Sequence, residues 1–240
     1  MSWFTPAAPP PDLADDLVTG WTARIEGGHR LVPDGCVDVL WIEGGRVVVC
    51  GPETTAWRIG LPAGTEAVGV RFRPGRAGPV LGFDAAEVRD RRVPLEDVLG
   101  SRAQRELAER LADAAPADRL GVLEARARRW LEAAPPRDPV TAAVTAALTR
   151  DPATPVSALA GATGLSERQL HRRCTAAFGY GPATLRRVLR LQRFLRMARH
   201  PGAPTDLARL AALAGYADQP HLSRDSRALA GASPRTLVGR

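Results

Sequence analysis

Two arginines at matching places in two similar segments have the chemistry needed to read a nucleic acid. Arg172 lies two residues after Leu170, and Arg224 lies two residues after Leu222. A guanidinium group can donate two parallel hydrogen bonds to guanine in the major groove of DNA, and a good pair discriminates between bases by about 1–3 kcal/mol. If each leucine is buried inside a helix, each arginine projects from the exposed side. The two arginines are therefore candidates for contact with the bases of a nucleic acid.

Further polar side chains share these segments. Some project from the same helix faces as the two arginines, and among them Gln219 can pair with adenine. The base-reading candidates are Arg168, His171 and Arg172 in the first segment and Gln219, Ser223 and Arg224 in the second. Other arginines are better suited to phosphate groups, where they add affinity without sequence information. These are Arg173, Arg187, Arg227 and Arg235.

Both segments have the residue pattern of a helix-turn-helix unit. Such a unit needs a small residue where the helices cross, a glycine that accepts positive φ in the turn, and an apolar residue that closes the corner. The trios are Ala160, Gly164 and Leu170 in residues 156–173, and Ala211, Gly215 and Leu222 in residues 207–224. Two trios, with alanines 51 residues apart, predict two such units.

Local signals also place the helices of this half. Ser166 and Asp218 are expected to cap the two recognition helices, and Pro220 fits the first turn of the second. Between the units, residues 184–199 predict one long helix, which spans about 24 Å and acts as a rigid spacer. We expect residues 139–240 to be entirely helical.

The charge is divided unevenly along the chain. Residues 1–138 hold 18 arginines and 21 acidic residues, a net charge of −3, whereas residues 139–240 hold 15 arginines and 5 acidic residues, a net charge of +10. A proline-rich stretch at residues 133–139 separates the two parts and predicts domains of 1–138 and 139–240. The excess of positive charge indicates that the C-terminal part meets a polyanion.

Several protein classes are disfavoured. No apolar run is long enough to cross a bilayer, and residues 1–16 lack the pattern of a signal peptide, so we expect a cytoplasmic protein associated with the nucleoid and no membrane partner. The three scattered cysteines form no CxxC pair, so neither a disulfide framework nor a zinc finger is indicated. No G-x-S-x-G elbow, phosphate loop or HExxH is present, so we expect neither an enzyme nor a cofactor.

The N-terminal part is predicted to be β first and α afterwards. β-Branched runs at residues 37–42 and 46–50 flank a glycine turn and predict a hairpin. Further strands are expected at residues 57–61 and 67–73, and in the latter Val68, Val70 and Phe72 share one face. Short helical turns are expected at residues 77–81 and 95–99, and longer helices at 102–114 and 119–131, the last with Asp118 as its N-cap. The fold class is therefore α+β, with a small antiparallel sheet or barrel.

The C-terminal half resembles the double helix-turn-helix DNA-binding domain of the AraC/XylS family of bacterial transcription regulators. The matching segments are residues 159–172, 178–182, 190–193, 215–224 and 231–234. The N-terminal half resembles a small domain of unresolved function that precedes some of these regulators, through residues 33–38, 51–52, 69–75 and 91–95.

The resemblance implies two recognition helices in successive major grooves, with promoter or operator DNA as partner. For the N-terminal domain, a cupin-like barrel is one of the expected forms of the small antiparallel sheet or barrel. RNA polymerase is a further partner if the regulator is an activator, and the sequence leaves activator or repressor, and monomer or homodimer, open. Cys174 and Ser226 stand where the family usually has Phe, which predicts looser cores, and a buried serine needs a hydrogen-bond partner.

The sensing chemistry of the N-terminal domain stays open. A small-molecule effector site is one hypothesis, with the candidates Cys36, Asp38, Trp41, Trp57 and Arg71. A metal site formed by His29, Cys36, Asp38 and Cys50 is another. A redox-sensitive thiolate at Cys36, with its pKa lowered by Arg30 or Arg71, is a third. Residues 33–38 are in any case expected to form a tight turn.

A competing interpretation needs no reading of bases at all. The basic half can be an electrostatic surface that binds an acidic partner, but that function does not require the helix-turn-helix trios. An RNA-binding protein is disfavoured because the sequence lacks aromatic-bearing strands of the kind that stack bases.

Overall fold

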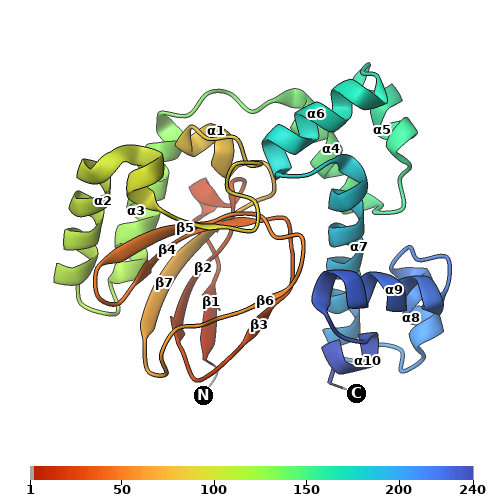
Figure 1. Cartoon of the computed structure of the whole chain (residues 1–240), viewed down its shortest axis with the longest axis horizontal. Coiled ribbons are helices and arrows are strands. Elements are labelled where there is room, and N and C mark those ends of the chain that lie inside the picture. Colours follow the sequence, from red (N-terminus) through yellow and green to blue (C-terminus); the bar gives the residue numbers. More distant parts are fainter. Residues whose placement is uncertain (1–2, 240) are drawn as a thin grey trace.

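A computed structural model describes residues 3–239. The chain first forms a β-rich part with covering helices, up to Glu132. A helical part from Pro139 onward lies beside it (Figure 1). None of the helices in the described range has the length and apolar character needed to cross a membrane. The α+β class expected from the sequence is confirmed.

The β-rich part contains one large and one small antiparallel sheet. The large sheet has the strand order β1-β2-β7-β4-β5-β8, so it is open, with β1 and β8 at its edges. Its strands are β1 (Phe4–Ala7), β2 (Leu17–Arg24), β4 (Val37–Ile42), β5 (Arg46–Cys50), β7 (Glu66–Phe72) and β8 (Arg92–Pro94). The small sheet pairs β3 (Arg30–Leu31) with β6 (Trp57–Arg58). The strand expected at residues 57–61 is therefore short, and β1, β2, β3 and β8 were not predicted.

The two faces of the large sheet pack differently. Val68, Val70 and Phe72 share one buried face, as the alternation predicted. On the opposite face Gly69 lies beneath Trp21, and a Cβ atom at Gly69 would overlap the indole. Glycine at this position therefore leaves room for the Trp21 ring.

Helices cover one face of the large sheet. Two short helical segments, a 3₁₀ turn (Pro11–Leu13) and α1 (Ala77–Leu81), precede the longer α2 (Leu95–Asp113) and α3 (Arg119–Glu132). The helical conformation of α2 is interrupted at Gly100, where φ is 85°, which agrees with the separate segments expected at 95–99 and 102–114. Asp118 stands at the N-cap position of α3, but its side chain makes no capping hydrogen bond.

The C-terminal part is entirely helical, as predicted. Its helices are α4 (Pro139–Arg150), α5 (Val156–Thr163), α6 (Glu167–Phe178), α7 (Pro182–Arg199), α8 (Leu207–Leu213), α9 (Gln219–Ala230) and α10 (Pro234–Leu237). The pairs α5–α6 and α8–α9 form the two helix-turn-helix units, and α7 is the long helix between them (Figure 1). The turn glycines take the expected left-handed conformation, with φ of 68° at Gly164 and 90° at Gly215.

The cores of both units are closed. Leu170 and Leu222 are fully buried, and so are Cys174 and Ser226. Cys174 acts as a small apolar filler. The hydroxyl of Ser226 has no hydrogen-bond partner among the described residues, so this core buries an unsatisfied polar group.

Candidate functional site

The first recognition helix, α6, begins with a complete capping box. The Ser166 hydroxyl accepts a hydrogen bond from the backbone N–H of Gln169, and the Gln169 side chain accepts one from the backbone N–H of Ser166. This fixes the first turn of α6. The three predicted base-reading residues of this helix, Arg168, His171 and Arg172, are all exposed.

The second recognition helix, α9, begins at Asp218. The Asp218 carboxylate accepts a hydrogen bond from the backbone N–H of His221 at 2.6 Å, and Pro220 lies in the first turn, as predicted. Gln219 and Arg224 are exposed, whereas Ser223 is half-buried. Both recognition helices thus bury a leucine and expose an arginine two residues later.

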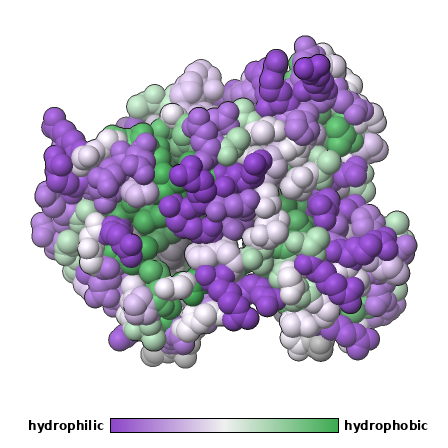
Figure 2. Space-filling view, in the orientation of Figure 1, coloured by the Kyte–Doolittle hydropathy of each residue, from purple (hydrophilic) through white to green (hydrophobic). Residues whose placement is uncertain are grey.

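The four predicted phosphate contacts divide into two pairs. Arg227 and Arg235 are exposed. Arg173 forms an ion pair with Asp138, the N-cap of α4, at 2.8 Å, and Arg187 forms one with Asp225 at 2.9 Å. Both of the latter arginines stay partly exposed, but each already has a carboxylate partner, and Asp225 is shared with Arg190. Hydrophilic side chains cover much of this helical part (Figure 2).

A buried polar cluster beneath α9 was missed by the sequence analysis. Arg190 of α7 donates a hydrogen bond to Asp225 of α9 at 2.9 Å, and its guanidinium lies over the Tyr216 ring. Its Nη2 atom is also 3.1 Å from Nε2 of His221. The cluster ties the long helix to the second recognition helix. The segment 190–193 was singled out for its family resemblance, but nothing in it indicated a buried charge.

A large cavity lies on the face of the large sheet that the N-terminal helices leave uncovered. Its volume is about 750 Å³. Apolar side chains from the sheet line one side, and residues of α7 contribute to the opposite wall. The sheet side chains include Trp21, Ala23, Leu40, Ile42 and Ala67, and those of α7 are Gln192, Leu195 and Arg199.

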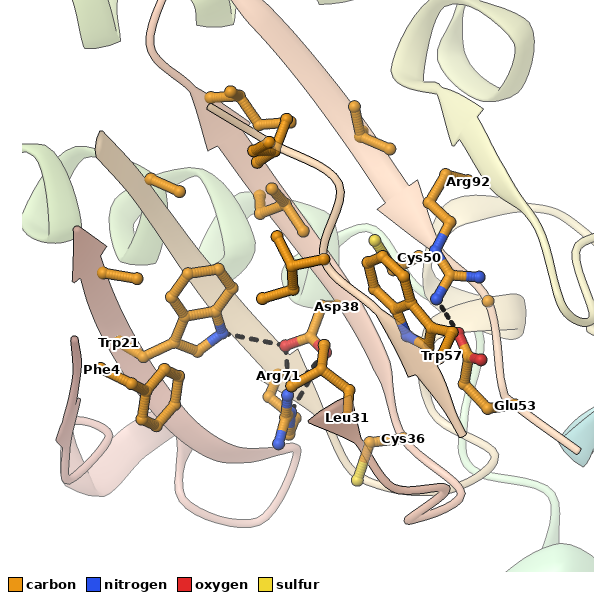
Figure 3. Close-up of a pocket in the computed structure, with 18 of the residues that line it drawn as sticks. Phe4, Trp21, Leu31, Cys36, Asp38, Cys50, Glu53, Trp57, Arg71 and Arg92 are labelled. Atoms are coloured by element: carbon orange, nitrogen blue, oxygen red, sulfur yellow. Dashed lines mark hydrogen bonds and ion pairs between the residues drawn. The ribbon is translucent and has the colours of Figure 1, made fainter. Parts of the chain in front are cut away.

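One end of the cavity is built from charged groups (Figure 3). The guanidinium of Arg71 donates three hydrogen bonds to Asp38 and forms an ion pair with Asp34 at 3.1 Å. The indole N–H of Trp21 donates to the same Asp38 carboxylate at 2.9 Å. Asp34 also accepts a hydrogen bond from the backbone N–H of Cys36, which forms the tight turn expected at residues 33–38.

A second charged group lies nearby. Arg92 donates a hydrogen bond to Glu53 and stacks on Trp57, with its guanidinium carbon 3.5 Å from the ring centroid. Burial raises the pKa of Glu53 to about 7, because its removal from water outweighs the attraction of Arg92. This carboxyl group is therefore only partly ionised near neutral pH.

Four of the five effector candidates line this cavity, namely Cys36, Asp38, Trp57 and Arg71. The fifth candidate, Trp41, does not line this cavity. Its side chain belongs to the core on the helix-covered face of the sheet, where Arg119 lies over its ring. Consecutive residues of a strand point to opposite faces, so Leu40 and Trp41 cannot both face the cavity.

The redox hypothesis for Cys36 finds no support in its surroundings. Burial, together with the carboxylates of Asp34 and Asp38, raises the pKa of Cys36 well above its usual value and outweighs the opposing effect of Arg71. Burial likewise raises the pKa of Cys50 to about 12. Both groups are therefore protonated thiols, which are poor nucleophiles.

The metal hypothesis finds no support in the geometry. His29 stacks on Trp3 with ring centroids 3.8 Å apart, and it does not line the cavity. Within residues 3–239, no group of three or more histidine, cysteine or acidic side chains is placed to hold a metal ion.

Sequence reasoning missed Trp21, Glu53 and Arg92. Trp21 lies on β2, whose residues Val18 to Thr22 include β-branched side chains that could have indicated a strand. Glu53 and Arg92 are 39 residues apart, and no local pattern brings them together.

Comparison with known families agrees with the arrangement of the chain. A family model described as a helix-turn-helix domain matches residues 159–240. A model described as a domain of unknown function, DUF6597, matches residues 6–94. No curated protein matches the sequence significantly.

Solved structures of ToxT from Vibrio cholerae have a similar fold. An apo ToxT variant from strain SCE256 gives a TM-score of 0.51 at 10% sequence identity and covers 100% of this chain and 98% of that chain. ToxT from O395 bound to (E)-4-(8-methylnaphthalen-1-yl)but-3-enoic acid gives 0.52 at 8% identity, with 99% of each chain covered. At this identity the likeness concerns the fold. The chain thus carries an AraC-type helix-turn-helix domain at residues 159–240, which follows a DUF6597 domain at residues 6–94.

Proposed function

We propose that the protein binds a specific duplex by inserting α6 and α9 into successive major grooves. The observation that carries this proposal is the matched construction of the two helices, each capped at its start, buried through Leu170 or Leu222 and exposed at Arg172 or Arg224. A merely basic surface requires none of these features. Because the two helices differ in their exposed side chains, the binding site is asymmetric.

The long helix α7 sets the distance between the two units. Its 18 residues span about 27 Å, which is comparable to the roughly 34 Å between successive major grooves on one face of DNA. In this arrangement Arg172 and Arg224 contact guanines, and Gln219 contacts adenine. Arg227 and Arg235 contact phosphates directly. Arg173 and Arg187 contact phosphates after they leave their ion pairs with Asp138 and Asp225.

The test is a selection of bound duplexes from a random pool, followed by fluorescence anisotropy of the full chain on the enriched duplex and on a scrambled duplex. We expect the enriched duplex to bind at least about a hundredfold more tightly. Arg172→Ala and Arg224→Ala should each remove about 1–3 kcal/mol of that preference, each at a different base position.

Arg105→Ala is the matched control, because Arg105 is an exposed arginine on α2, outside both units. It should leave the preference unchanged. If no motif is enriched and both duplexes bind equally with a steep salt dependence, the basic half is an electrostatic surface for an acidic partner, and the proposed function is wrong.

We further propose that the cavity receives a small-molecule effector. Its volume of about 750 Å³ lies in the range of ligand pockets, and its apolar walls with a charged end are the usual composition of such sites. The compound named in the ToxT structure is an aromatic acid. An aromatic acid that fluoresces in apolar surroundings, 1-anilinonaphthalene-8-sulfonate, is therefore a suitable first probe.

The cavity proposal is tested by filling the cavity. Ala67 lines it from β7, so Ala67→Phe should weaken binding of the probe at least about tenfold. Ala115→Phe makes the same change at an exposed position and should have no effect. Equal binding to both variants would show that the probe lies elsewhere and would contradict the assignment.

A further inference from the structure

A small two-stranded ribbon lies between the cavity and the second recognition helix. β3 and β6 pair only with each other and not with the large sheet. We call residues 30–31 and 56–58 the flap ribbon. Its side chains Leu31 and Trp57 line the cavity, and the Trp57 ring is stacked against Arg92 of β8. This stack joins the flap ribbon to the large sheet across the cavity (Figure 3).

The flap ribbon also holds the end of α9, and Arg30, which makes one of these contacts, lines the cavity as well. The backbone N–H of Ala56 donates a hydrogen bond to the carbonyl of Leu229 at 2.7 Å. The guanidinium of Arg30 donates to the carbonyl of Ala230 at 3.1 Å. These are the last two residues of α9, and carbonyl groups at a helix C-terminus lack partners within the helix and favour a nearby cation. The flap ribbon therefore caps the second recognition helix.

The first recognition helix is anchored independently of the cavity. The backbone N–H of Ala85 donates to the carbonyl of Ala176 at 2.8 Å, and Arg89 donates to the carbonyl of Gly179 at 2.9 Å. Neither Ala85 nor Arg89 lines the cavity. Gly75 packs so closely on Phe178 that a Cβ atom would have no room. The end of α6 is thus fixed by a tight contact that a cavity ligand does not touch.

We propose that the cavity regulates α9 selectively. A ligand that changes the position of the flap ribbon changes the support of α9, while α6 keeps its own anchor. In an asymmetric DNA site, only the half that α9 contacts then gains or loses affinity. The ligand shifts the equilibrium between two positions of the flap ribbon, and the size of the shift is set by the difference in its affinity for the two positions. The consequence for DNA rests on the function proposed above, but the link from flap ribbon to α9 can be measured without DNA.

The test uses hydrogen exchange of the full chain, read by mass spectrometry, because local opening of a helix shows directly in its amide exchange. In Arg30→Ala, peptides from residues 219–231 should exchange about tenfold faster, since a hydrogen bond to a charged group and a helix-terminal cation are lost together. Peptides from residues 167–179 should be unchanged. Arg30→Lys, which keeps a cation and a donor, should restore much of the protection.

Two further variants test the cavity side of the flap ribbon. Trp57→Ala removes the stack on Arg92 and should also raise exchange in α9 and not in α6. Arg58→Ala is the matched control, because Arg58 is exposed on the same ribbon and pairs across it with Arg30. It should behave as the unchanged protein. Equal changes in α6 and α9, or no change in either with Arg30→Ala or Trp57→Ala, would overturn the proposal.

The same variants are then measured on the selected duplex. In Trp57→Ala, base substitutions in the half contacted by α9 should matter less, whereas substitutions in the other half keep their full effect. A uniform loss over both halves contradicts selective regulation. If the chain selects no duplex, the proposed function fails, but the exchange experiment still decides whether the flap ribbon supports α9.

Discussion

Nη2 of Arg190 and Oδ2 of Asp225 are 2.9 Å apart, and each side chain is only 6% exposed. This ion pair joins the long helix α7 to the recognition helix α9 inside the second helix-turn-helix unit. If one partner is removed, the remaining buried charge lowers the stability of the protein, because the protein interior solvates it poorly. The orientation of α9 on its unit therefore depends on two residues that are buried beneath it.

Removing one partner of this pair should destabilise the protein strongly. We expect Arg190→Met to lower the free energy of unfolding by about 3 kcal/mol, because Asp225 loses its buried partner and keeps the partly exposed Arg187 and, at 3.9 Å, His221. The double variant Arg190→Met with Asp225→Leu should recover most of this loss. Denaturant unfolding measures both. A double variant as unstable as the single one would show that the packing of Arg190, and not its charge, is essential.

The buried hydroxyl of Ser226 makes the second core less stable than it could be. Because this hydroxyl has no hydrogen-bond partner among the described residues, Ser226→Ala should raise the free energy of unfolding by about 1 kcal/mol. Ser157→Ala makes the same change on an exposed helical position and corrects for helix propensity. Thermal unfolding compares the two variants. A loss of stability in Ser226→Ala greater than in the control would mean that the hydroxyl is satisfied in solution.

Glu53 should make stability depend on pH. Its pKa is raised from an ordinary 4.5 to about 7, so between these values the folded state binds more protons than the unfolded state. Stability contributed by this group is therefore greatest below pH 4.5 and is lost as the pH rises through 7. Glu53→Gln, which cannot ionise, should gain stability relative to the unchanged protein over that interval. Melting temperatures from pH 4.5 to 8 measure the difference, and parallel curves would contradict the assignment.

The thiols should be unreactive in the folded protein. Burial raises the pKa of Cys50 and of Cys174 to about 12, and that of Cys36 also lies well above its usual value. At pH 8 we expect labelling by a thiol-specific disulfide reagent to be at least about tenfold slower than in the unfolded chain. Rapid labelling of one equivalent in the folded state, lost in Cys36→Ala, would revive the redox hypothesis.

Some parts of this protein depend on chemistry within a few residues and can be predicted from the order of the amino acids. The positive φ of Gly164 and Gly215 and the caps at Ser166 and Asp218 act within a few residues, so the two helix-turn-helix units could be predicted from spacing alone. The hairpin of β4 and β5 was predicted for the same reason. The exposed arginines followed from the helical period once the buried leucines were known.

The surroundings of the cavity depend on contacts between distant parts of the chain. β4 buries residues on both faces, so hydrophobicity along this strand does not tell that Leu40 faces the cavity and Trp41 the helices. The groups at the charged end come from strands and loops far apart in the chain, and β2 and β4 bring Trp21 to Asp38 because both pair with β7. The contact between Arg30 and Ala230 joins residues 200 positions apart. Such contacts depend on how the sheet and helices pack together, and no local pattern records that packing.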